Sequence, residues 1–177
     1  MTFKLTLKQL RDADACIKGY NKLVCHLSGK EFDAEKETHI RFAHKESISI
    51  LTILESNGLD DALWALRCLE NHDRDLRLFA VWCSREVEHL ASDERVKNCN
   101  DVAEKFANEK STNEDLAAEA AADASRAAGA AARAAAADAA DAADAADAAR
   151  SAARVAQSEM LAKMCNGDAP WQIESVK

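Results

Sequence analysis

The alanine-rich stretch in the second half of the chain constrains the fold more than any other feature. Between Ala117 and Ala156 the chain contains 26 alanines, and its 177 residues include one proline and five glycines. Alanine has the highest helix propensity of all residues, whereas glycine and proline have the lowest. We therefore predict an all-α protein, a helical bundle with a long Ala-rich C-terminal helix.

The stretch contains a three-residue repeat, Ala-Ala-Asp. Three residues advance about 300° around a helix, so each aspartate lies about 60° behind the previous one. The aspartates therefore wind round the helix, unlike the flat face of an ice-binding helix or the slowly drifting seam of a coiled coil. A spacer or packing helix is favoured over a specific acidic surface. If a partner does contact the repeat, it contacts Asp138, Asp141, Asp144 and Asp147.

An unbroken helix through this stretch would be long for a chain of this size. About 50 residues span about 75 Å, roughly twice the width of a compact body of this chain. The helix must therefore protrude, break or be shared with a second copy, and Gly129 is where it would kink or fold back. We expect a helical bundle over 1–110, the Ala-rich segment over 111–165 and a tail over 166–177.

Capping residues and apolar spacing predict a series of helices in the first 110 residues. We expect Thr6 to cap the first helix and Ser28-Gly29 to end the second. The stretch Ser47–Leu54 alternates as a strand would, but we predict a helix because an isolated strand has no partner. Further helices are expected to begin at Leu59, at Asp75 and near Val96.

The helix expected over Asp75–Leu90 has two apolar faces. A helix with this pattern is either central in a bundle or also meets a partner, and the central position is favoured. The first face consists of Leu76, Phe79, Ala80, Cys83, Val87 and Leu90. The second face, about 120° away, would be the one that meets a partner, and consists of Leu78, Trp82 and His89.

The C-terminal tail carries two large apolar residues, Trp171 and Ile173, after the only proline. Tryptophan is favoured as an anchor in protein interfaces, so both residues are candidates for partner binding. The alternative is that they dock back on the bundle, which we favour.

Cysteine and histidine show no spacing that is typical of a reactive site. The six cysteines are expected to be reduced and mostly buried, because five lie among apolar residues at helical spacing. There is no Cys-x-x-Cys pair, no HExxH and no Gly-rich phosphate loop. We therefore expect no metal, no cofactor and no enzymatic activity, although a Cys–His pair that meets only in space stays open.

Charge and hydropathy limit the partners. The formal net charge of −8 argues against nucleic-acid binding, which needs a basic footprint, but permits a basic protein partner. The N-terminal residues lack the apolar core of a signal peptide, and no stretch approaches the about 20 apolar residues of a membrane span. We expect a soluble, cytoplasmic protein.

Three adjoining stretches resemble a known family. They are GLDDALWALRC (Gly58–Cys68), DLRLFAVWCSREVEHL (Asp75–Leu90) and the stretch from Asp93 to Ala135. These are similar to bacterial and bacteriophage immunity proteins of the Imm-5-like kind over about residues 58–150. The resemblance implies an all-helical fold and a role in neutralising a toxin or another effector, and it supplies no catalytic residues. Relatives have an Ala-Asn-Gly turn where this chain has Ala107-Asn108-Glu109.

Two functions follow from these observations as hypotheses. The first is a non-enzymatic inhibitor that binds and blocks a bacterial protein effector, which in a phage can be a host defence component such as a CRISPR surveillance complex. The second is a structural protein that self-associates, for example as a homodimer, through the Ala-rich helix.

Overall fold

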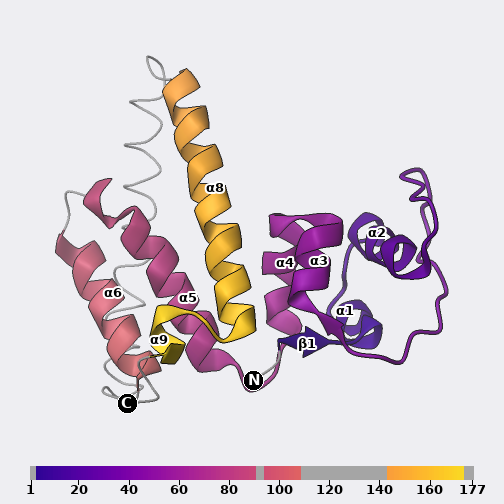
Figure 1. Ribbon diagram of the computed structural model, residues 1–177, viewed down its shortest axis with the longest axis horizontal. Helices are drawn as coiled ribbons and strands as arrows, with labels where there is room; N and C mark the ends of the chain where they lie inside the picture. The colour runs from indigo at the N-terminus through magenta and orange to yellow at the C-terminus, as the bar shows by residue number, and fades with distance from the viewer. Residues whose placement is uncertain (1–2, 91–93, 109–142, 174–177) are drawn as a thin grey trace. The chain divides into compact units, whose positions relative to one another are not determined.

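A computed structural model describes residues 3–90, 94–108 and 143–173 (Figure 1). The described chain is all-α apart from one pair of two-residue strands, which confirms the predicted fold class. It divides into two compact units, Met1–His72 with Cys165–Asp168 and Asp73–Met164 with Ala169–Lys177. No division between His72 and Asp73 is predicted from the sequence. The predicted boundary at 110 and the predicted kink at Gly129 lie outside the described residues.

The strand pair corrects one prediction. Strand β1 (Lys4–Leu5) pairs antiparallel with β2 (Ile48–Ser49), with Leu5 opposite Ile48. The stretch 47–54 is therefore part strand, and the helix α3 (Ile50–Asn57) begins only after it. The Oγ of Ser49 accepts a hydrogen bond from the backbone N–H of Leu51 (3.2 Å) and caps this helix. The helix prediction failed at these two residues because their strand partner lies more than 40 residues away in the sequence.

The first two helices begin and end at the capping residues that the sequence contains. Helix α1 (Leu7–Asp12) is preceded by Thr6, which exchanges hydrogen bonds with Gln9 in a capping box. Helix α2 (Ile17–Ser28) ends at Gly29, whose φ of +65° is a left-handed conformation that glycine adopts without a steric penalty. Both predicted helix ends are confirmed.

One buried side chain holds the long connection between α2 and β2. Asn21 is 1 % exposed, and its Nδ2 donates to the carbonyl oxygen of Thr38 (3.0 Å). Its Oδ1 accepts from the backbone N–H of Ile40 (2.8 Å). Because both ends of the amide are paired with the main chain, residues 38–40 lie against α2 without forming a strand or a helix.

Helix α4 (Leu59–Ala65) follows α3 without a loop, because Gly58 (φ +98°) ends one helix and begins the next. A short 3₁₀ helix, η1 (Leu66–Cys68), continues it. Helix α3 packs against both α2 and α4, and their buried side chains form the core of the first unit. Each fully buried valine, leucine or isoleucine side chain stabilises such a core by about 1.5–3 kcal/mol. The buried core residues include Leu23, Val24, Ile50, Ile53, Leu59 and Ala62.

In the second unit, α5 (Asp73–Glu86) packs against α6 (Glu94–Ala107), and the short 3₁₀ helix η2 (Glu88–Leu90) lies between them in sequence. Figure 1 shows α5 and α6 side by side. Arg85 joins them, since its Nη2 donates to Asp101 Oδ1 (2.8 Å) and Glu104 Oε2 (2.6 Å). The hydrogen bond from Arg85 lowers the pKa of Asp101 below its usual value.

The predicted first face of the Asp75–Leu90 helix is wrong in part. The apolar residues that are buried on α5 are Leu78, Phe79 and Val81, whereas Ala80 is exposed and Val87 is 49 % exposed. Helix α5 ends at Glu86, so Val87 lies beyond the helix and no longer follows its periodicity. Alanine carries too little apolar surface to require burial, which explains the exposure of Ala80.

The C-terminal part consists of the long helix α8 (Ala143–Asn166) and the single turn α9 (Pro170–Ile173). Gly167, at φ +84°, follows α8 and lies between the two helices. Near its C-terminal end α8 buries Met160, Leu161 and Met164, whereas residues 149–155 are exposed. No helix in the described part of the chain combines the length and the apolar character that a membrane span requires.

Candidate functional site

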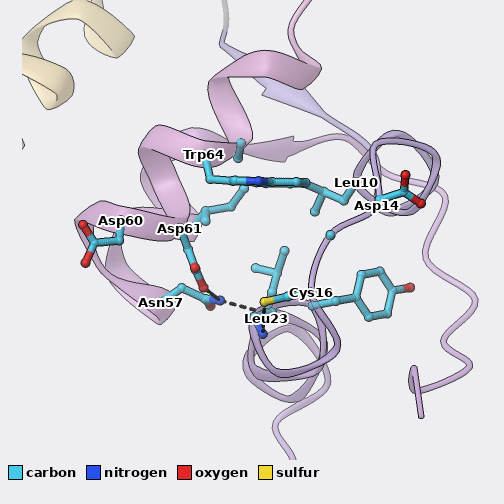
Figure 2. A pocket seen from close by; sticks show the side chains of 13 residues that line it. Leu10, Asp14, Cys16, Leu23, Asn57, Asp60, Asp61 and Trp64 are labelled. Atoms are coloured by element: carbon cyan, nitrogen blue, oxygen red, sulfur yellow. Dashed lines mark hydrogen bonds between the residues drawn. The ribbon is translucent and has the colours of Figure 1, made fainter. Parts of the chain in front are cut away.

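A cavity of about 320 Å³ lies in the first unit, bordered by residues of α1, α2, α3 and α4 (Figure 2). Its walls combine apolar, aromatic and acidic side chains. Pockets that bind small molecules or single side chains have this composition, a mostly apolar lining with a few convergent polar groups. The cavity is therefore the candidate site, and its walls are described in turn.

The N-terminal part of α2 forms one wall of the cavity and lies at the bottom of Figure 2. Cys16 precedes the helix, and its Sγ accepts a hydrogen bond from the backbone N–H of Gly19 (3.3 Å). A Cβ at residue 19 would lie 2.8 Å from Asp61 Oδ2 and 3.2 Å from Cys16 Sγ. Since the first distance is shorter than real Cβ contacts, the absence of a side chain at Gly19 is what lets the carboxylate of Asp61 approach α2.

Asn57 holds Asp61 in this place. Its Nδ2 donates to Asp61 Oδ2 (2.7 Å) and to the carbonyl oxygen of Gly19 (2.7 Å), and its Oδ1 accepts from the hydroxyl of Ser56 (2.7 Å). Every polar atom of the Asn57 side chain therefore has a partner. The amide connects the end of α3 to the first turns of α2 and α4, so the Asp61 carboxylate has a defined position.

Two aromatic side chains complete the walls. In Figure 2 the indole of Trp64 lies across the cavity from Cys16. Tyr20 also lines the cavity. The guanidinium carbon of Arg67 is 5.0 Å from the centroid of the Trp64 ring, but Arg67 does not line the cavity. Tyr20 is buried, its hydroxyl accepts from Arg11 Nη1 (3.3 Å), and the ring of His39 meets it edge-on at 5.0 Å. The remaining apolar wall includes Leu10, Leu23, Ile53 and Ala65.

The charge of the lining is of one sign. Asp14, Asp60 and Asp61 line the cavity, and of the described residues that line it none is Lys, Arg or His. In Figure 2 Asp61 points toward Asn57 and α2, whereas Asp14 and Asp60 lie on opposite sides of the cavity. Carboxylates form charge-assisted hydrogen bonds with cations, and the face of a tryptophan ring attracts a cation through its quadrupole. The arrangement can therefore hold a cationic group that carries an apolar stem.

The residues that the sequence predicts for partner binding on α5 do not form one exposed face. Leu78 is 4 % exposed, Trp82 is half-buried and stacked near Phe79, and His89 is exposed in η2. Leu78 is thus a packing residue and is not available at the surface. The helical wheel placed these residues together because it continued α5 to Leu90, although the helix ends at Glu86.

The predicted partner-binding residues of the C-terminal tail and of the Ala-Ala-Asp repeat differ in where they lie. Trp171 docks back on α5, as we favoured, because its Nε1 donates to Asp75 Oδ1 (3.0 Å), whereas Ile173 is 57 % exposed. Asp144 and Asp147 belong to the helical backbone of α8, and their side chains lie outside the described part. Asp138 and Asp141 lie outside the described residues. Of the predicted residues whose side chains the structure describes, none lines the cavity.

All six cysteines are free thiols, and their burial is lower than the sequence predicts. Cys25 and Cys68 are buried, three are half-buried and Cys16 is exposed. Burial raises the pKa of the thiol of Cys83 to about 11 and that of Cys165 to about 12. An activated cysteine nucleophile needs the opposite shift. Within residues 3–90, 94–108 and 143–173, no group of three or more His, Cys, Asp or Glu side chains is placed to hold a metal ion.

The cavity was not predicted from the sequence, although part of its signal is local. Asp61 and Trp64 are three residues apart on α4 and therefore lie on one face of the helix. Taken alone, Asp60 and Asp61 indicate only a helix start, where acids complement the helix dipole. The contributions of Cys16, Gly19 and Tyr20 have no such signal, because α2 is about 40 residues away in the sequence.

Comparison with known proteins adds no relative, since no protein-family model, curated protein or solved structure matches this chain. The resemblance to immunity proteins thus stays an expectation carried by its three motifs.

Proposed function

We propose that this protein is a non-enzymatic binding protein that recognises a basic side chain on a protein effector and blocks that effector. The observation that carries the proposal is the cavity, which joins three aspartates to an aromatic and apolar wall and has no basic residue among the described residues that line it. The resemblance to immunity proteins implies the same class of function, with a bacterial toxin or defence component as the effector.

The size of the cavity supports a protein side chain as the occupant. Its volume of about 320 Å³ is at the lower end of ligand pockets, which range over about 300–1,000 Å³. Protein interfaces concentrate their binding energy in a few anchors that fill such pockets, with tryptophan and charged pairs prominent among them. Trp64 and Asp61 supply these two kinds of contact on one turn of α4.

The test is a pull-down from bacterial lysate that compares chains with an intact cavity and chains with a substituted cavity residue. The immobilised wild-type chain is compared with Asp61→Asn and Trp64→Leu, which alter the cavity. Glu55→Gln and Trp82→Leu serve as matched controls, since Glu55 is exposed on α3 and Trp82 lies on α5. We expect one protein to bind the wild type and both controls and to be lost from both cavity variants. Equal recovery with all five chains would rule the cavity out as the docking site.

A second function, self-association through the Ala-rich helix, has one observation in its favour. Residues 149–155 of α8 are exposed, and Val155 is 59 % exposed. Small alanine side chains permit another helix to approach closely. This function predicts a solution mass by light scattering that is a multiple of 19.2 kDa and that falls when Ala137–Ala149 are deleted. A monomer mass for the wild type would reject it.

A further inference from the structure

The chemical group that binds in the cavity can be specified further. This inference rests on the proposed function only for the statement that the group belongs to a protein. We infer that the cavity binds a primary ammonium group on an unbranched apolar stem, which in a protein is the side chain of lysine. Three features of the cavity carry this inference: its charge, the hydrogen bonding of Asp61 and the apolar wall.

The charge selects a cation. Asp60 and Asp61 lie on α4 and Asp14 lies between α1 and α2, and no basic residue lines the cavity among those described. Figure 2 shows Asp61 pointing toward Asn57 and α2, whereas the carboxylates of Asp14 and Asp60 lie at the outer sides. Arg11 at the Tyr20 ring, Arg67 at the Trp64 ring and Lys22, whose Nζ donates to the carbonyl oxygen of Asn57 (3.4 Å), do not line the cavity. A lining whose charged residues are all aspartates disfavours an anion and favours a positive group.

The hydrogen bonding of Asp61 favours an ammonium over a guanidinium. A guanidinium binds a carboxylate best through two parallel hydrogen bonds, one to each oxygen. The Oδ2 of Asp61 already accepts from Asn57 at 2.7 Å, and it lies 2.8 Å from the place of a Cβ at residue 19. The oxygen is therefore enclosed by α2 and α3, so a bidentate approach is obstructed. An ammonium needs only one oxygen from each acceptor and directs its three N–H groups separately.

The apolar wall of the cavity favours a ligand whose ammonium is carried by an aliphatic chain. Leu10, Leu23 and Trp64 line the same cavity as the aspartates, so methylene groups can be removed from water beside them. Figure 2 shows the Trp64 indole facing the side of the cavity where Asp61 and Cys16 lie, which places an ammonium bound to Asp61 near an aromatic surface. A lysine side chain has four methylenes followed by the charged ammonium. The methylenes match the apolar wall, and the ammonium matches the carboxylate of Asp61.

The exposed thiol of Cys16 makes the inference measurable, because it lies in the wall of the cavity. Its reaction with the uncharged, thiol-specific reagent 4,4′-dithiodipyridine is followed by peptide mass spectrometry at fixed pH and ionic strength. The probes are Nα-acetyl-lysine methylamide, the arginine derivative and the norleucine derivative, which has an apolar stem without the charge. We expect the lysine derivative to protect Cys16 saturably at about 1–10 mM, and the other two to bind at least about fivefold more weakly.

Three variants test the geometry. Asp61→Asn should weaken protection by the lysine derivative about tenfold, whereas the exposed control Glu55→Gln should not change it. Gly19→Ala retains every charge and favours the helix, but its Cβ displaces the Asp61 carboxylate, so it should also weaken protection. Equal protection by the lysine and norleucine derivatives, tighter binding of arginine, or unchanged binding to Asp61→Asn would each overturn the inference.

The failure of the inference and the failure of the proposed function are distinguishable. Protection by the lysine derivative with no protein recovered from lysate would leave the inference standing and reject the function. A partner that is lost from both cavity variants, together with tighter protection by the arginine derivative than by the lysine derivative, would reject the inference and leave the function standing. If a partner is recovered, acetylating its lysines removes their charge and should abolish binding, and binding that survives acetylation would contradict a lysine as the occupant.

Discussion

Single side chains with several hydrogen bonds determine the local geometry of the first unit. Asn57 and Asn21 each use both ends of the amide, the first to place Asp61 in the cavity and the second to place residues 38–40 against α2. Both connect segments that are distant in sequence. An asparagine that is paired at both ends specifies one arrangement, because any other leaves polar atoms unpaired.

Replacing Asn21 should release the segment that it holds. In Asn21→Ala the carbonyl oxygen of Thr38 and the N–H of Ile40 lose their partner, and a cavity is left in the core. We expect the free energy of unfolding to fall by about 1–3 kcal/mol and the amide of Ile40 to exchange its hydrogen faster. Denaturant unfolding and hydrogen exchange measure both effects, with the exposed Asn98→Ala as control. Unchanged exchange at Ile40 would show that other contacts hold the segment.

The thiols should differ in their dependence on pH. A pKa raised to about 11 for Cys83 and about 12 for Cys165 favours the neutral thiol, so at pH 8 less than about one in a hundred of either is the reactive thiolate. We expect the alkylation rates of both to rise through pH 10, while the exposed Cys16 reacts first at neutral pH. Peptide mass spectrometry over a pH series measures this order. A rate for Cys83 that levels off near pH 9 would contradict the raised pKa.

At the scale of elements, short helices are held by specific contacts rather than by their own propensity. Helix α9 has four residues, too few to be stable alone, and Trp171 connects it to α5 through Asp75. Within α9, Gln172 closes the turn, since its Oε1 accepts from the N–H of Ala169 (3.1 Å) and its Nε2 donates to the carbonyl of Met164 (3.1 Å). The position of the tail is thus set by side-chain hydrogen bonds.

Trp171→Phe tests this connection. The substitution retains an aromatic ring but removes the indole N–H, so Asp75, which is 8 % exposed, loses this donor. We expect the free energy of unfolding of the second unit to fall by about 1–3 kcal/mol. Asp75→Asn is the matched variant, because its amide oxygen can still accept from Trp171 and its cost should be smaller. Equal losses for the two variants would show that the hydrogen bond is not what holds α9.

At the scale of the whole molecule, the charge is distributed unevenly along the chain. The formal net charge is −8, but residues 1–72, which contain the cavity, have ten Lys and Arg against eleven Asp and Glu. The acidic excess therefore belongs to residues 73–177. The proposed attraction of a basic partner to the cavity is consequently a local effect of its aspartates and not a long-range effect of net charge.

Binding through such a local cluster should have a moderate dependence on salt. The Debye length falls from about 10 Å at 0.1 M salt to about 3 Å at 1 M, so the cavity and its ligand still interact when distant charges are screened. We expect the affinity for the recovered partner to fall by about threefold to tenfold between these concentrations, as measured by calorimetry. Asp61→Asn should show a weaker dependence. A loss of a thousandfold or more would instead indicate steering by the acidic remainder of the chain.

Features that depend on neighbouring residues are predictable from the sequence. The all-α fold class, the cap at Thr6 and the helix end at Gly29 follow from propensities that act within one turn. Such features are predictable because the residues that cause them are adjacent.

The remaining features depend on contacts between segments that are distant in sequence, and they appear only in the folded chain. They are the β1–β2 pair, the burial of Leu78 in place of Ala80 and the approach of Asp61 to Gly19, and the sequence spacing of these residues carries no signal. The cavity belongs to this second class. Asp61 and Trp64 lie on one face of α4 by sequence, but the Asp61 carboxylate can lie against α2 only because residue 19 has no side chain.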